Sequence, residues 1–456
     1  MNKLATYFTP KMLIIFALGL TSGLPLPLVF GTLSYWLATL GVDKTTIGLF
    51  AALTAPYNLK FMWSPLMEKL SIPYLTAKIG HRKSWLIVCQ GLVIGAMLFL
   101  GGTNPTDTLF LTALGAFLLS VASASYDIVV DAYRVELLEE KEYGEGSAMG
   151  VNGYRIGMLV SGAGALFLSD YIGWFAVFAI MAGVMLIGTV AVLFAPSLYK
   201  EKITADKADK KQGGMRKIGL TIGAIVIAGG LYKLDITSGF ISYLIILITM
   251  CVLWFPKTPI AGLSKTDWIM IILLVSLYKF SDAFAGTMMT PFYVDLGFSG
   301  KEIASVSKIF GLIATLIGAF LGGYTVSKIG MYRGLFWGAI LQMLSNLVFI
   351  EQARQGHSVE FLTLTIAIEN LSGGFGTAAF VAFITGLCHN SKFVATEYAL
   401  LTSISGLGRT ILSSSSGGII DYYALSWEQF FLMTTLTGVP VLIILRCMKG
   451  SIVRDK

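Results

Sequence analysis

Charged residues are scarce in this chain of 456 residues, where Asp, Glu, Lys and Arg together make up 13%. Soluble domains carry about 25% charged residues. A chain so poor in charge, with 55% hydrophobic residues, has too little polar surface to cover itself in water. Apolar runs of about twenty residues recur, which is the length of a transmembrane helix and too long for a barrel strand. The sequence therefore predicts an all-α polytopic membrane protein.

Cysteine and histidine are also rare. Because they form no cluster in the sequence, most metal sites and redox sites built from these residues are excluded. The four cysteines are far apart, without metal-ligand or redox spacing, and we interpret them as small apolar fillers. The three histidines fall in or near predicted loops, so they form no proton relay. The glycines at Gly374 and Gly376 are not a nucleotide loop, because no strand precedes them and no phosphate-binding lysine follows. We predict no metal, no cofactor and no enzymatic activity.

The apolar runs divide the chain into two halves and a spacer. Two further candidate spans follow a charged stretch that begins at Lys200, which gives roughly fourteen helices in all. We predict an N-terminal six-helix bundle at 1–196, a cytoplasmic linker with an extra helix pair at 197–260, and a C-terminal six-helix bundle at 261–456. The candidate spans are 12–38, 45–65, 84–101, 108–133, 147–169, 174–195, 218–232, 239–255, 268–294, 302–327, 334–350, 361–388, 394–420 and 429–447.

The basic residues support this arrangement, because Lys and Arg gather in cytoplasmic loops. With a cytoplasmic N-terminus, most of the 33 basic residues fall on the cytoplasmic side. The opposite side receives only Lys44, Lys233, Lys301 and Arg354. Both termini are then cytoplasmic, and the net charge of +7 reflects loop placement rather than a nucleic-acid partner. The stretch from Met12 continues as a full span, so we expect no cleavable signal peptide.

A dense polar passage interrupts the fourth predicted span between Ser123 and Glu136. Asp127 and Asp131 lie four residues apart, so they share one helix face. A carboxylate within a bilayer costs several kcal/mol unless it is paired, hydrated or protonated. We therefore predict proton coupling at Asp127 and Asp131. The alternative for Asp131 is that it marks the cytoplasmic helix end together with Arg134.

Cations within predicted spans suit an anionic solute. Arg155 keeps its charge, so inside a bundle it needs an acid, a carbonyl or an anionic ligand. Asp127 is one candidate partner. A substrate carboxylate could take the place of Asp127 beside Arg155 while Asp127 takes up a proton. The alternative is a permanent structural ion pair between Asp127 and Arg155. Lys308 lies in another span. The predicted substrate-binding residues are Lys60, Tyr154, Arg155, Lys279, Asp282, Glu369, Asn370 and Arg409.

In the second half, Lys279 and Asp282 lie three apart on one predicted helix face, where self-pairing is the simpler interpretation. Glu369 and Asn370 precede a glycine-rich passage that permits close helix contact or a helix break near a cavity. In the first span, Pro25 and Pro27 remove backbone bonds, which predicts either a helix broken along a translocation path or a simple kink.

The two halves share a loop pattern, K-I-G-x-x-[KR], at Lys78–Lys83 and Lys328–Arg333. Two six-helix halves in the same orientation are typical of major facilitator transporters. The first loop, with Glu68 before it, resembles the loop signature of that superfamily. The resemblance implies a conformational latch formed by Glu68, Gly80, Arg82 and Lys83, in which the acid pairs with loop cations and with a neighbouring helix end.

Longer polar strings narrow the resemblance. They include Ser22-Gly-Leu-Pro25, the passage from Ser123 to Tyr133, and Gly153-Tyr154-Arg155. Others are Leu277-Tyr-Lys279-Phe-Ser-Asp282, Glu369-Asn370-Leu-Ser-Gly-Gly374 and Ala395-Thr396-Glu397-Tyr. With these strings the chain resembles the AmpG muropeptide permease family of the major facilitator superfamily, over nearly all of its length outside 197–260. The central pair is outside the family's core pattern, and Glu397 stands where the family often has a neutral residue.

The resemblance implies inward transport of N-acetylglucosaminyl-1,6-anhydromuramyl peptides across the bacterial inner membrane, driven by the proton gradient, for cell-wall recycling. Protons, the anionic muropeptide and the lipid bilayer are then the partners, and we expect a monomer. Transport of another anionic solute by the same fold is the alternative. A membrane enzyme or receptor is disfavoured because no metal, nucleophile or nucleotide motif is present.

Overall fold

The computed structural model describes most of the chain outside 197–264, and every described element is a helix. The described residues are 6–42, 46–47, 50, 52–196, 265–303, 305–306, 310–389, 391, 393–413 and 416–448. Within them, nine helices are long and apolar enough to cross a membrane. The expected all-helical membrane architecture is therefore confirmed. The predicted helix pair at 218–232 and 239–255 lies outside the described residues, so the predicted count of fourteen and the domain bounds stay predictions.

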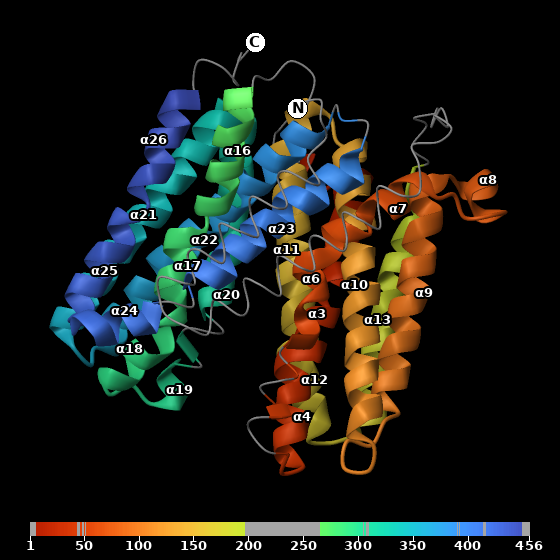
Figure 1. Ribbon diagram of the computed structural model, residues 1–456, viewed down its shortest axis with the longest axis horizontal. Helices are drawn as coiled ribbons and strands as arrows, with labels where there is room; N and C mark the ends of the chain where they lie inside the picture. Colours follow the sequence, from red (N-terminus) through yellow and green to blue (C-terminus); the bar gives the residue numbers. More distant parts are fainter. Residues whose placement is uncertain are drawn as a thin grey trace. The chain divides into compact units, whose positions relative to one another are not determined.

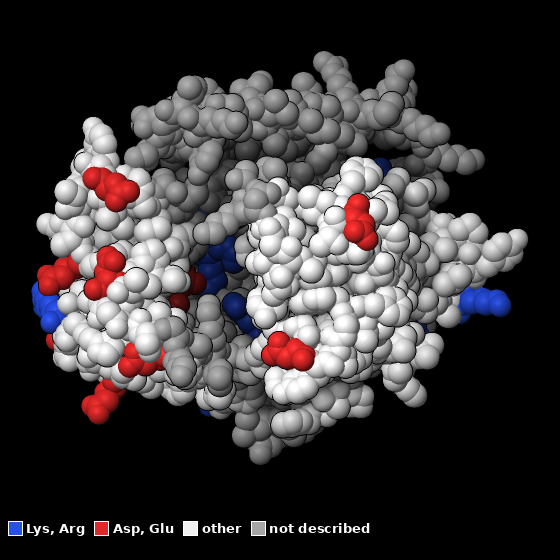
Figure 2. Space-filling model, turned by 90° about the horizontal axis from the view of Figure 1, so that it is seen from below, with Lys and Arg blue, Asp and Glu red and all other residues white. Residues whose placement is uncertain are grey.

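The described surface matches a lipid environment. Large apolar side chains such as Phe110, Phe194 and Leu193 are exposed on the outer sides of helices. Figure 2 looks onto the helix ends from below and shows acidic side chains as separate spots on this largely uncharged face. Exposed apolar surface of this extent would be unfavourable in water and is expected next to hydrocarbon.

The chain forms two compact units. The first comprises Met1–Glu201 with Cys388–Ala399, and the second comprises Lys202–Leu387 with Leu400–Lys456. Two of the unit boundaries therefore fall within described helices, one before the last residue of α22 (Val359–Cys388) and one within α23 (Val394–Ser413). The helices of the first unit are α2 (Pro10–Gly23), α3 (Pro25–Pro27), η1 (Leu28–Thr32), α4 (Leu33–Thr39), η2 (Ala52–Thr54), α6 (Pro56–Leu59), η3 (Lys60–Met62), α7 (Ser64–Lys69), α8 (Leu75–Ile79), α9 (His81–Gly101), α10 (Leu109–Leu137), η4 (Glu140–Glu142), α11 (Tyr143–Leu159), η5 (Val160–Gly164), α12 (Ala165–Ser169) and α13 (Trp174–Phe194).

Proline and glycine shape the first unit. The first span is interrupted at Leu24: α2 ends at Gly23, and the short α3 begins at Pro25, followed by the π-helical turn η1. Leu24 keeps α-helical dihedral angles and Pro10–Thr39 counts as one span, so the prolines interrupt the hydrogen-bond ladder locally, because they lack the N–H, without ending the helix. Helix α2 packs on α11, and a Cβ added to Gly157 would overlap the carbonyl oxygen of Leu20. Helices α10 and α13 both pack against α9 (Figure 1).

The second unit contains α16 (Lys265–Leu277), α17 (Phe280–Thr287), α18 (Met289–Asp295), α19 (Gly300–Ile303), α20 (Gly311–Ile329), α21 (Met331–Gln355), α22 (Val359–Cys388), most of α23 (Val394–Ser413), α24 (Ser416–Tyr423), α25 (Trp427–Leu436) and α26 (Val439–Met448). Its aromatic core joins α18, α21 and α25. Phe431 lies 4.9 Å from Phe292 edge-on and 4.9 Å from Phe349 in a stack, measured between ring centroids. Such aromatic pairs contribute about 0.5–1.5 kcal/mol beyond their burial.

The repeated loop pattern has a repeated backbone conformation. Gly80 ends α8 and begins α9 with φ 88° and ψ 163°, while Gly330 joins α20 to α21 with φ 90° and ψ 159°. Positive φ of this kind favours glycine. The two glycines therefore make equivalent turns, which supports an internal repeat of the two halves. The polar partners differ, because Arg82 follows the first turn and Tyr332, which donates to the carbonyl oxygen of Leu445 at 2.6 Å, follows the second.

Candidate functional site

The first polar centre is the Asp127 carboxylate on α10. Its Oδ1 accepts a hydrogen bond of 2.5 Å from the Ser22 hydroxyl, and Asp127 is only 8% exposed. Ser22 belongs to the last turn of α2, directly before the interruption at Leu24. The neighbouring residues are also joined, because the hydroxyls of Thr21 and Tyr126 lie 2.9 Å apart. The end of α2 therefore holds Asp127 through a neutral partner.

Asp131 lies one turn further along α10 and has charged partners instead. Its Oδ2 is 3.6 Å from Lys60 Nζ, and its Oδ1 accepts from Arg134 Nη2 at 2.9 Å. The same Arg134 Nη2 donates to the Tyr398 hydroxyl at 2.5 Å. Helix α10 ends at Leu137 with Arg134 in its last turn, so the Asp131–Arg134 pair lies close to that end, as the alternative interpretation expected. The two predicted proton-coupling carboxylates thus differ in surroundings, one beside a hydroxyl and one between two cations.

Tyr154 and Arg155 lie on α11, the helix that packs on α2. Both are half-buried. The ion pairs found among the described residues do not include Arg155, so the pairing with Asp127 considered from the sequence is not observed in them. Asp127 is bound to Ser22 instead. The permanent structural pair that the sequence also allowed is therefore not observed among the described residues either.

Lys279 is the centre of the second unit's polar cluster. Its ammonium donates to Gln342 Oε1 at 2.7 Å, to the Gly373 carbonyl oxygen at 3.2 Å and to Asp282 Oδ2 at 3.3 Å. The predicted pairing of Lys279 with Asp282 is thus observed. The helix is interrupted there, because α16 ends at Leu277 and α17 begins at Phe280. Lys279 therefore connects the α16–α17 interruption to α21 and α22.

Glu369 and Asn370 lie on α22, which runs without a break from Val359 to Cys388. Asn370 donates to Glu369 at 2.5 Å and accepts from the Thr315 hydroxyl at 2.9 Å. A Cβ on Gly374 would overlap the carbonyl oxygen of Thr315, so Gly374 permits close contact between α20 and α22, and the passage does not break the helix. Arg409 is exposed on α23. Lys308 lies outside the described residues.

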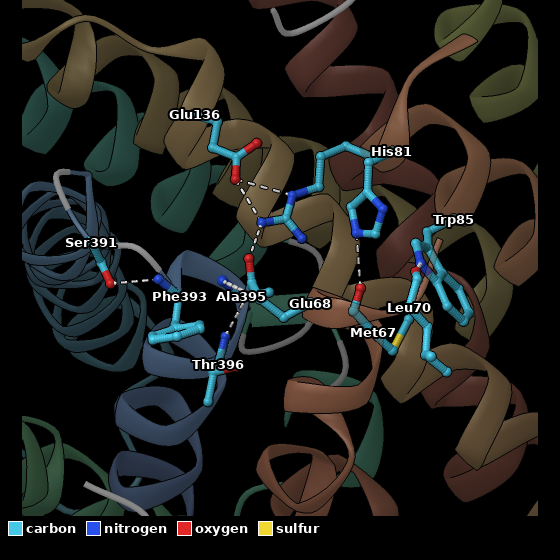
Figure 3. Close-up of polar contacts among 11 residues, drawn as sticks. Met67, Glu68, Leu70, His81, Trp85, Glu136, Ser391, Phe393, Ala395 and Thr396 are labelled. Atoms are coloured by element: carbon cyan, nitrogen blue, oxygen red, sulfur yellow. Dashed lines mark hydrogen bonds and ion pairs between the residues drawn. The ribbon is translucent and has the colours of Figure 1, made fainter. Parts of the chain in front are cut away.

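Three of the residues predicted to form a latch, Glu68, Arg82 and Lys83, take part in a polar network in the first unit. Arg82, in the first turn of α9, donates to Glu68 at 2.5 Å and to Glu136 at 2.6 and 3.0 Å (Figure 3). Glu68 and Arg82 are each 8% exposed. Lys83 extends the network by donating to the carbonyl oxygen of Ala195 at 2.8 Å. Three helices, α7, α9 and α10, are thereby joined through Arg82, whose partner Glu68 is buried and whose partner Glu136 is partly exposed.

The Glu68 carboxylate also caps α23. Its Oε2 accepts from the backbone N–H groups of Ala395 at 2.7 Å and Thr396 at 3.2 Å, which are the second and third residues of α23 (Figure 3). A capping side chain normally comes from the residue before the helix, and satisfies N–H groups that have no partner within it. Here that residue is Phe393, so Glu68 supplies the cap from α7. This is the acid-to-helix-end contact that the loop signature implied.

Comparison with known proteins identifies the family. The sequence profile of the Major Facilitator Superfamily matches residues 12–217. AmpG 4 of Rickettsia felis is 36% identical over 438 residues, which cover 94% of this chain and 94% of that protein. The chain belongs to the AmpG family of the major facilitator superfamily.

Other relatives agree with this assignment. The anhydromuropeptide permease of Escherichia coli K12 is 34% identical over 438 residues, which cover 96% of this chain and 79% of that permease. The crystal structure of the human organic anion transporter MFSD10 matches with a TM-score of 0.63 over 95% of this chain and 98% of that one. Its sequence identity is 12%, so this likeness shows the fold alone. The AmpG-family chain is therefore a multi-pass membrane transporter with the major facilitator fold.

Several partners in this AmpG-family site were not predicted from the sequence. Ser22, Gln342, Glu136 and Tyr398 all come from parts of the chain distant from their partners. Ser22 stood in a motif that carried the resemblance, which was a usable signal, but its partner was not evident. Among the described residues, no group of three or more His, Cys, Asp or Glu side chains is placed to hold a metal ion.

Proposed function

We propose that this protein imports N-acetylglucosaminyl-1,6-anhydromuramyl peptides by proton symport and alternating access. The similarity to the anhydromuropeptide permease of Escherichia coli supports this substrate class. The inner membrane of a Gram-negative bacterium is then its location, with both termini in the cytoplasm and a monomer as the working form. The imported products would enter cell-wall recycling.

The observation that carries the proton-coupling proposal is the contrast between Asp127 and Asp131. Asp131 is paired with two cations, Lys60 and Arg134. Asp127 is buried beside the neutral Ser22 hydroxyl and has no cation within ion-pair distance among the described residues. Burial disfavours a charged carboxylate. Asp127 is therefore the proton carrier of the pair, and Asp131 holds Lys60 and Arg134 in place.

Arg155 and Lys279 have different roles in this proposal. The ammonium of Lys279 has three N–H donors, and three acceptor oxygens lie within hydrogen-bond distance of it. Its hydrogen-bonding capacity is therefore satisfied without substrate. Arg155 forms none of the ion pairs observed among the described residues and is half-buried. We assign the carboxylate of the peptide stem to Arg155, with Tyr154 beside it. Lys279, Asp282 and Gln342 form a structural link that changes when the α16–α17 interruption bends.

Uptake competition tests the substrate class. Proteoliposomes at equal pH on both sides would receive labelled disaccharide peptide together with an excess of unlabelled disaccharide, free stem peptide or complete muropeptide. We expect the complete muropeptide to compete most strongly, and the Arg155→Ala variant to lose discrimination between peptide-bearing and peptide-free sugars. If the labelled compound does not enter vesicles that contain folded protein, another anionic solute is the substrate.

A further inference from the structure

A second buried carboxylate lies beside the cap of α23. Glu397 occupies the first turn of this helix, two residues after Ala395 and directly after Thr396. It is 7% exposed, and its Oε2 has no hydrogen-bond partner among the described residues. Arg82 and Arg134 are bound to other acids, and the ion pairs of the described residues do not include Glu397. The latch and the proposed transport chemistry make no use of this group.

The neighbours of Glu397 favour its neutral form. Glu68 of α7 and the thiol of Cys388 at the end of α22 interact with it electrostatically, and the Ser391 hydroxyl is its hydrogen-bonding neighbour. Glu68 is negatively charged and bound to Arg82, which neutralises part of that charge. An ionised Glu397 would therefore be a second negative charge at a helix end that already holds one. Burial and the neighbouring charge of Glu68 oppose ionisation, whereas the Ser391 hydrogen bond and the helix N-terminus favour it.

We infer that Glu397 is a proton-binding site, separate from Asp127, whose occupancy controls the Glu68 cap of α23. With the proton bound, Glu397 adds no negative charge beside Glu68 at this end of the helix, and the cap is strong. When the proton leaves, repulsion between Glu397 and Glu68 weakens the bonds to Ala395 and Thr396. The cap is therefore tighter at lower pH. The inference requires neither muropeptide as the substrate nor Asp127 as the proton carrier.

The first experiment detects the proton directly. Infrared difference spectra between low and high pH, recorded on the protein in lipid nanodiscs, report the C=O stretch of protonated carboxyl groups. We expect Glu397→Gln to remove one such band and Asp127→Asn to leave that band in place. If the spectrum of Glu397→Gln matches that of the wild type, Glu397 does not titrate and the inference is wrong. Loss of a band only in Asp127→Asn would overturn this inference while supporting the proposed coupling.

The second experiment measures the cap. Hydrogen exchange of the peptide that contains Ala395 and Thr396, corrected for intrinsic exchange rates, is followed across the pH range of the infrared transition. We expect wild-type exchange to rise about fivefold with pH, the size of a modest electrostatic coupling. Glu397→Gln, which mimics the protonated form, should stay slow at every pH. Exchange that still varies with pH in Glu397→Gln would show that Glu397 does not control the cap.

A third variant covers the case in which Glu397→Gln fails to insert. Glu68→Gln keeps Glu397 but removes the negative charge on which it acts. Exchange of Ala395 and Thr396 should then be fast and independent of pH. Persistence of the wild-type pH dependence in Glu68→Gln would refute the coupling of these two carboxylates.

Discussion

Replacing Glu68 with Gln removes one negative charge from the point where α7, α9 and α23 meet. The carboxylate accepts from Arg82 at 2.5 Å, from Ala395 at 2.7 Å and from Thr396 at 3.2 Å. Glutamine keeps one oxygen acceptor in nearly the same shape, so the substitution tests the charge rather than the volume. We expect the capped conformation to lose stability, because hydrogen bonds to a charged group are stronger than neutral ones.

The size of the loss follows from these contacts. Hydrogen bonds to charged groups contribute about 1.5–3 kcal/mol, and a helix cap contributes about 1 kcal/mol. Removing one member of a buried ion pair costs about 3–5 kcal/mol when the partner is left alone. Arg82 is not left alone, because it still binds Glu136 at 2.6 Å. We therefore expect a loss of about 2 kcal/mol, or about thirtyfold in the equilibrium between capped and uncapped conformations.

Hydrogen exchange at fixed pH measures this equilibrium, with Glu136→Gln as the matched control. Glu136 binds Arg82 through two bonds, and none of the described contacts joins it to α23. Exchange of the Ala395 and Thr396 amides should rise about thirtyfold in Glu68→Gln and much less in Glu136→Gln. Equal increases in both variants would show that Arg82, rather than the cap, holds α23. Unchanged exchange in Glu68→Gln would refute the cap itself.

Three further outcomes follow from the structure. Asp127→Asn should abolish accumulation of substrate against its concentration gradient, while uptake to equal concentrations persists. Asp131→Asn should instead lower protein yield, because it removes the carboxylate partner of Lys60 and Arg134. Proton-driven accumulation in vesicles that contain Asp127→Asn would contradict the first of these expectations. Arg155→Ala should raise the KM for uptake by about tenfold with little change in maximal rate, and Arg155→Lys should recover part of it; an unchanged KM would make Arg155 structural. Gly157→Val should place a side chain against the Leu20 carbonyl and lower the thermal unfolding midpoint in detergent, whereas Gly164→Val, at a position with open space around it, should not.

The sequence predicted those parts of the molecule that depend on local chemistry. Low charge and long apolar runs indicated membrane helices, and Pro25 indicated the interruption after Gly23. The shared loop pattern indicated the matching turns at Gly80 and Gly330. Each of these features depends on residues close together in the chain, so a single sequence contains the necessary information.

The pairing of buried polar groups could not be predicted in the same way. Asp127 binds Ser22, 105 positions away, rather than Arg155. Glu68 binds N–H groups more than three hundred positions away, and the sequence suggested a helix end without specifying which one. A buried carboxylate requires some partner, but several candidates satisfy that requirement equally well until helix packing selects one. The helix interruption at Lys279 was also missed, because no proline or glycine marks it in the sequence.

Proton-driven accumulation of the proposed substrate tests the central claim most directly. Purified protein in proteoliposomes would receive labelled N-acetylglucosaminyl-1,6-anhydromuramyl peptide, with an imposed inward proton gradient of about one pH unit and with the gradient collapsed by an ionophore. One proton carried per substrate across that gradient provides about 1.4 kcal/mol, which sustains about tenfold accumulation. We expect accumulation of this order that disappears with the ionophore. Uptake that only reaches equal concentrations on both sides, with or without the gradient, would contradict it.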